Sequence, residues 1–159
     1  MLANSLEALL AAPGLRDMRI ADLRAIAAAS SPRTCHRGQD ACSAVGEGNL
    51  LPVLVAGRVS LGLRMAGERC RGWREVVLQG PGHVLAWRLL MRPERLTIVI
   101  SCPGPARLLL VHLARLSPDL RLRLLKRLAV YLYGELQRLG LCPPNATAIG
   151  VLARSAVEQ

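Results

Sequence analysis

The stretch PVLVAGRVSL (Pro52–Leu61) decides the fold of this chain. It contains two short apolar runs that lie on either side of one glycine. Runs of this length, rich in β-branched residues, are typical of β-strands. A glycine between them can supply the positive φ that a tight hairpin turn requires. The stretch therefore predicts strands at 50–55 and 59–63, joined by a hairpin at Gly57.

Similar apolar runs recur toward the C-terminus, and breaks rich in glycine and proline separate them. The runs lie at 75–78, 96–100 and 107–111. Short strands with turn signals at regular spacing are typical of an all-β sandwich, roll or barrel. Residues 33–111 are therefore predicted to form a β-roll of the jelly-roll type.

Helices are expected on both sides of this roll. Apolar residues at helical spacing predict N-terminal helices over 2–12 and 19–29, and the second ends before Pro32 because the residue before a proline disfavours the helical region. After the roll, Ser117-Pro118-Asp119 combines a capping serine, a proline at the first helical position and an acidic residue near the positive end of the helix. The fold class is thus mainly β with flanking helices, the last of which is a long helix over 117–139.

The long helix is longer than a small roll needs for its own cover, at about 34 Å for a rise of ~1.5 Å per residue. Four of its leucines follow a/d heptad spacing: Leu125, Leu128, Leu132 and Leu139. We interpret them as the interface of a homodimer. The alternative is a helix that packs wholly on its own roll. Its basic residues, Arg121, Arg123, Lys126 and Arg127, are expected to face solvent.

Length and composition fit one globular domain, predicted over 1–139, with a C-terminal tail over 140–159. Hydrophobic residues make up 52% of the chain and charged residues 20%, which argues against disorder. No apolar run approaches the roughly 18–20 residues that span a bilayer. The first residues lack the basic segment of a secretory signal, so we expect a cytoplasmic protein without a membrane partner.

The chain is basic, with a formal net charge of +10 from 21 basic and 11 acidic residues. Such a balance permits attraction to nucleic acids or other polyanions. The basic residues are scattered, however, and aromatic residues make up 3% of the chain, which leaves few platforms for stacked bases. A solvated arginine surface is therefore favoured over a dedicated polyanion site.

No catalytic or metal site is predicted. The three histidines are far apart in the sequence, and no Gly-x-Ser-x-Gly motif marks a nucleophile. Five cysteines occur without a Cys-x-x-Cys pair, and in a cytoplasmic chain free thiols are the default. A redox or metal sensor that uses Cys35 and Cys42 is kept as an alternative.

The order of helices, glycine-punctuated roll and long helix resembles the regulatory domain of the bacterial catabolite activator and fumarate–nitrate regulator family. That domain shares its fold with eukaryotic cyclic-nucleotide-binding domains. The resemblance covers about residues 6–139. Four segments carry it: CHRG at 35–38 with Gly46, the 52–61 stretch, EVVLQGPGHVLAW at 75–87 and Ser117-Pro118-Asp119. The third is similar to the strand that leads into the family's phosphate-binding cassette.

In that family a Gly-Glu pair opens the cassette helix, whose amides receive the cyclic phosphate while the glutamate takes the ribose hydroxyl. An arginine further on neutralises the phosphate. Here Ala86-Trp87 replaces the pair, Arg95 stands near the arginine, and Thr97 stands near a neighbouring Ser/Thr. The resemblance thus implies ligand-binding residues Ala86, Trp87, Arg88, Arg95 and Thr97. Trp87 cannot accept a hydrogen bond from a ribose, because the indole only donates.

These departures predict a degenerate cassette. The expected function is a non-enzymatic regulatory module that binds an anionic small ligand or a partner protein. A genuine cAMP- or cGMP-binding regulatory protein is the alternative, in which a cyclic nucleotide is the ligand. In the family's transcription factors a helix-turn-helix domain follows the long helix. Residues 140–159 are too few for one, so we interpret this tail as a remnant or a truncated form of that domain and expect no sequence-specific DNA binding.

Overall fold

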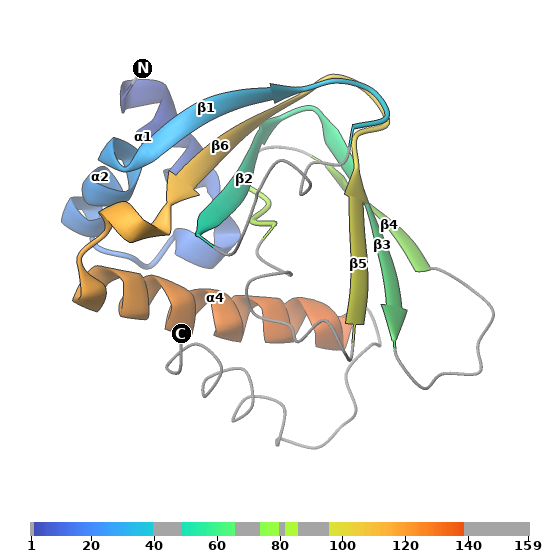
Figure 1. Ribbon diagram of the computed structural model, residues 1–159. Helices are drawn as coiled ribbons and strands as arrows, with labels where there is room; N and C mark the ends of the chain where they lie inside the picture. The colour runs from blue at the N-terminus through green and yellow to red at the C-terminus, as the bar shows by residue number, and fades with distance from the viewer. Residues whose placement is uncertain (1, 40–48, 66–73, 80–81, 86–95, 139–159) are drawn as a thin grey trace.

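The computed structural model describes residues 2–39, 49–65, 74–79, 82–85 and 96–138 (Figure 1). Its helical elements are α1 (Leu2–Ala11), η1 (Pro13–Leu15), α2 (Ile20–Ala28), η2 (Leu113–Arg115) and α4 (Pro118–Arg138). Its strands are β1 (Ser30–Cys35), β2 (Leu50–Ala56), β3 (Arg58–Met65), β4 (Arg74–Gln79), β5 (Leu96–Ser101) and β6 (Ala106–His112). The predicted fold class, mainly β with helices before and after the strands, is confirmed.

The strands form two antiparallel sheets, with the orders β1-β6-β2 and β4-β3-β5. The apolar strand β6 is central in the first sheet, and β3 is central in the second. Figure 1 shows α1 and α2 gathered against the first sheet, while α4 runs beneath the roll. This arrangement encloses one core between the sheets and the helices.

The prediction of a hairpin at Gly57 is wrong, although the positive φ predicted for this glycine is confirmed, at 90°. Strands β2 and β3 belong to different sheets, so the chain turns a corner at Gly57 instead of folding back on itself. A second corner, between β5 and β6, lies directly against it. A Cβ on Gly57 would lie 2.4 Å from the carbonyl oxygen of Pro105. Strands that change sheets at such corners are a general feature of packed β-sheets.

The roll begins earlier than predicted, because β1 starts at Ser30 and not at Arg33. Its sequence, SSPRTC, has no apolar alternation that would indicate a strand. Pairing with β6 supplies the stability instead, from Ser30 opposite Val111 to Cys35 opposite Ala106. Pro32 is accommodated because β1 lies at the edge of the described sheet, where a missing N–H disrupts no ladder.

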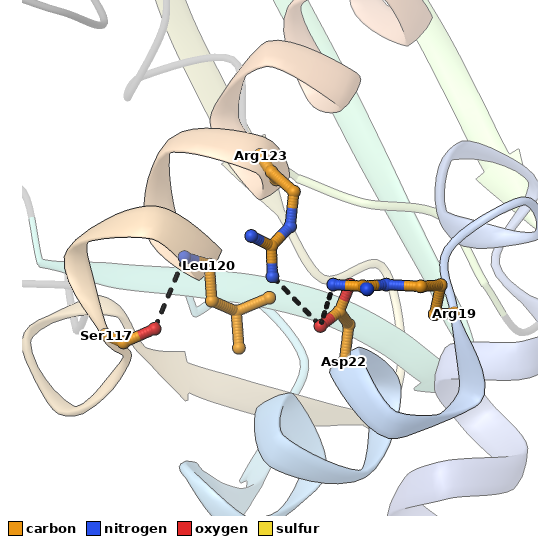
Figure 2. A network of polar contacts seen from close by, with 5 residues as sticks. All are labelled: Arg19, Asp22, Ser117, Leu120 and Arg123. Carbon is orange, nitrogen blue, oxygen red and sulfur yellow. Dashed lines mark hydrogen bonds and ion pairs between the residues drawn. The ribbon is translucent and has the colours of Figure 1, made fainter.

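Helix α4 begins as predicted. The Leu120 N–H donates to the Ser117 hydroxyl oxygen at 3.3 Å, which caps the helix (Figure 2). Its apolar side packs on the chain's own core, however, and leaves Leu128 and Leu132 at 0% and 1% exposed. The prediction that these two leucines contact a second copy is therefore wrong. Their spacing serves an intramolecular helix face equally well, because leucines three and four positions apart share one side of a helix.

The remaining leucines of the predicted stripe give a mixed result. Leu125 is half-buried and packs against the core, and Leu139 lies outside the described residues. The C-terminal tail over 140–159 also lies outside them. No helix within the described ranges combines the length and the apolar character that a membrane crossing needs.

Candidate functional site

The structure describes the entrance to the predicted cassette and its exit. Ala86, Trp87, Arg88 and Arg95 lie outside the described residues, so their predicted roles stay predictions. Thr97 lies on β5, opposite Arg64 of β3. The chain reaches the cassette through Gly82–Leu85 and leaves it into β5.

The entrance segment, residues 82–85, is tied to the free edge of β2 by backbone hydrogen bonds. The Gly82 N–H donates to the Leu54 carbonyl, and the Leu54 N–H donates to the His83 carbonyl, both at 2.8 Å. The Leu85 N–H donates to the Pro52 carbonyl, also at 2.8 Å. Val84 and Leu85 are 2% and 1% exposed. The cassette therefore starts from a fixed point in the core.

The same segment touches the C-terminal end of α1 through Gly82, whose φ is 97°. A Cβ at this position would lie 2.6 Å from the Ala11 carbonyl oxygen and 2.8 Å from the Ala12 Cα. Both atoms belong to the backbone, so no side chain can rotate away to make room. The sequence predicts a glycine-rich break here, but it does not predict that the break packs against the first helix.

The N-terminal segment in turn holds α4 through two aspartates, Asp17 before α2 and Asp22 on it, and Figure 2 shows the second. One carboxylate oxygen of Asp22 accepts a hydrogen bond from Arg19 Nε at 3.1 Å, and the other accepts one from Arg123 Nη2 at 3.0 Å. The hydrogen bond from Arg19, aided by Arg123 and opposed by burial, lowers the pKa of Asp22. Asp17 forms an ion pair with Arg127. We call this pair of contacts the helix clamp.

The helix clamp corrects the expectation that Arg123 and Arg127 only face solvent. Sequence reasoning missed it because Asp22 and Arg123 are 101 positions apart, so no local spacing indicates the pair. A packing contact supports the clamp. A Cβ on the buried Gly14 of η1 would lie 2.9 Å from the Tyr131 ring. Burial, with Glu135 adding to it, raises the pKa of Tyr131, so this ring stays neutral against η1.

Cys35 and Cys102 are both buried, each at 1% exposure. Cys102 helps to close the roll, because its carbonyl accepts the Gly38 N–H at 2.8 Å. Cys42 lies outside the described residues, so the sensor built on Cys35 and Cys42 stays a prediction. Within the described ranges, no three His, Cys, Asp or Glu side chains gather as a metal site.

No protein-family model and no curated protein matches the sequence. Solved structures are similar to it in fold. The regulatory domain of Toxoplasma gondii protein kinase A with cAMP has a TM-score of 0.55 and 14% identity, over 99% of this chain and 50% of that one. The regulatory subunit of a cAMP-independent protein kinase A from Trypanosoma brucei has a TM-score of 0.62 and 14% identity, over 86% of this chain and 47% of that one.

A third similar structure is the N-terminal domain of a transcriptional regulator from Streptomyces coelicolor A3(2). Its TM-score is 0.53 at 21% identity, over 80% of this chain and 94% of that one. The chain thus spans about half the length of the two kinase proteins and most of the regulator domain. At these identities the likeness establishes architecture: the chain has the β-roll fold shared by cyclic-nucleotide-binding regulatory domains and the sensor domains of transcriptional regulators.

Proposed function

We propose that this chain is a non-enzymatic, ligand-sensing regulatory module of the cyclic-nucleotide-binding type. The observation that carries the proposal is a continuous series of contacts. It runs from the entrance segment through α1 and α2 to α4. A ligand or a partner protein bound at residues 86–95 would act directly on one end of this series, and α4 forms the other end.

The contacts suit a two-state device. The approach of Gly82 to Ala11 is a close backbone contact, so a shift of residues 82–85 toward α1 would displace the end of that helix. The helix clamp consists of surface ion pairs, with Arg123 and Arg127 side chains 47% and 39% exposed. Surface ion pairs contribute little to stability, so these polar contacts of α4 can break and re-form at small cost while its apolar side stays packed in the core. A fixed entrance joined to polar contacts that rearrange easily supports the role of a switch.

We further propose that the ligand is an anion other than cAMP or cGMP. Arg88 and Arg95 supply positive charge at the cassette, while Ala86-Trp87 removes the acceptor for a ribose hydroxyl. The fold is compatible with either outcome, since one similar protein was solved with cAMP and another is named cAMP-independent.

Calorimetric titration with cAMP, cGMP and cyclic dinucleotides tests the ligand. We expect no binding of cAMP or cGMP in the micromolar range. Binding of a cyclic dinucleotide that Arg95→Ala abolishes would support the proposal, and Arg115→Ala on η2 is the control for the loss of one exposed positive charge. Micromolar binding of cAMP that depends on Arg95 would replace the proposal with the genuine cyclic-nucleotide sensor. If none of these compounds binds, a partner protein takes the place of the small ligand.

The homodimer remains part of this proposal, through the outward side of α4. Val130 on that side is 61% exposed, unlike the buried leucines opposite it. Light scattering at high protein concentration measures the mass in solution. A mass of 17.2 kDa, that of one chain, would contradict the homodimer.

A further inference from the structure

A cavity of about 280 Å³ lies between the first turns of α1 and the outer side of the first sheet. Its polar lining comes from Asn4 and Ser5 on α1, Arg33 and Thr34 on β1 and Arg107 on β6, and Val55 adds apolar surface. The cavity is near the lower limit of about 300 Å³ for ligand pockets, which fits a small molecule. We call it the α1 groove. Within the described ranges, its lining residues come from α1, β1, β2 and β6.

The strand register explains why a hollow forms here. Thr34 lies opposite Arg107, and directly paired residues of antiparallel strands present their side chains on the same face. On the other side of β6, the register with β2 shifts between Leu54 and Ala56, which marks Val55 as the extra residue of a β-bulge. Bulges bend a strand and redirect its side chains, so the sheet surface is hollowed next to Arg107.

The α1 groove is positively charged. Arg33 and Arg107 both line it, and no aspartate or glutamate is among its described lining residues. Arg107 is exposed, and within the described part of the chain it makes no side-chain hydrogen bond or ion pair. The first turn of α1 has no acidic residue, so its partial positive charge is not neutralised there. Excess positive charge beside neutral hydrogen-bonding side chains favours an anion.

We propose that the α1 groove binds a small organic phosphate monoester. The guanidinium of Arg107 matches a phosphate with two parallel N–H donors. The amide of Asn4 and the hydroxyl of Thr34 are available as further donors. Val55 and Pro32 provide apolar contact for the ester group. This proposal does not rest on the proposed function.

Titration with phenyl phosphate, followed by calorimetry and by amide NMR shifts, tests the groove. We expect binding with a dissociation constant of about 1 mM or tighter, weakened at least about tenfold by Arg107→Ala. Arg115→Ala, which removes an exposed arginine outside the groove, should leave the affinity unchanged. In the unmodified protein, shifts should concentrate at Asn4, Thr34 and Val55, which checks the site without any substitution.

Other ligands separate the parts of the probe. Inorganic phosphate should bind more weakly than phenyl phosphate, and phenol should not bind measurably, because each lacks one half of the recognised chemistry. Benzoate binding as tightly as phenyl phosphate would overturn the preference for phosphate. Affinity that Arg107→Ala leaves unchanged, or that Arg95→Ala abolishes, would overturn the groove as the site. Absence of binding at about 10 mM would overturn the proposal as a whole.

Discussion

Replacing Gly82 with alanine probes the contact between the cassette entrance and α1. Gly82 has a φ of 97°, and a residue with a side chain costs about 1–2 kcal/mol in the left-handed region. The new Cβ would also lie 2.6 Å from the Ala11 carbonyl oxygen, and overpacking typically costs about 1–3 kcal/mol. We therefore expect Gly82→Ala to lower the free energy of unfolding by about 2–5 kcal/mol.

Gly38 provides the matched control. Its φ is 81°, but nothing lies within 4 Å of the position that a Cβ would take. Gly38→Ala should therefore cost only the conformational strain, about 1–2 kcal/mol. Urea denaturation of the wild type and both variants at one pH gives the three free energies of unfolding. If Gly82→Ala is no more destabilised than Gly38→Ala, the close approach to α1 does not constrain the entrance segment, and the reasoning is refuted.

Three further predictions concern α4 and the helix clamp. Leu128→Ala should lower the free energy of unfolding by about 2–5 kcal/mol, while Val130→Ala, at a position 61% exposed, should change it by less than about 0.5 kcal/mol. Equal losses of both variants in urea denaturation would contradict the burial of Leu128 in the chain's own core. Gly134→Ala, at an open position four residues before the end of α4, should raise the free energy of unfolding by about 0.5–1 kcal/mol, and a loss in the same assay would count against a continuous helix there. The pKa of Asp22 is lower in the folded chain than its unfolded value of 3.8. Its carboxylate therefore stabilises the fold at a pH above that unfolded pKa, and this contribution is lost as the pH falls through the lower folded pKa. Wild type should thus exceed Asp22→Asn in stability by more at about pH 7 than at about pH 2, and a difference independent of pH would show that the charge plays no part.

Local features of the fold could be predicted from the sequence. The positive φ of Gly57 and the cap from Ser117 follow from short-range chemistry, and both occur. The partner of a strand is not a local property. Whether β2 folds back on β3 or crosses to another sheet depends on the corner at Pro105, far along the chain. The polar strand β1 was missed for the same reason, because its stability comes from the apolar strand β6.

The candidate site could be predicted less completely. The spacing of Leu128 and Leu132 fits a dimer interface and a helix face packed on the chain's own core equally well. Only the position of the roll, which buries both side chains, decides between the two interpretations. The helix clamp joins Asp22 to Arg123 across most of the chain, so no motif could indicate it. The groove beside Arg107 depends on a bulge at Val55, and a single extra residue in a strand leaves no periodic signal in an apolar run.

Amide hydrogen exchange of Gly82→Ala, read over α4 by mass spectrometry, tests the coupling between the cassette entrance and the long helix most directly. Gly38→Ala serves as the reference, because it destabilises the chain without disturbing the contact with α1. We expect exchange in residues 118–138 of Gly82→Ala to rise beyond the increase seen in Gly38→Ala, together with exchange in α1. Faster exchange confined to α1 and residues 82–85, with α4 as protected as in Gly38→Ala, would contradict it.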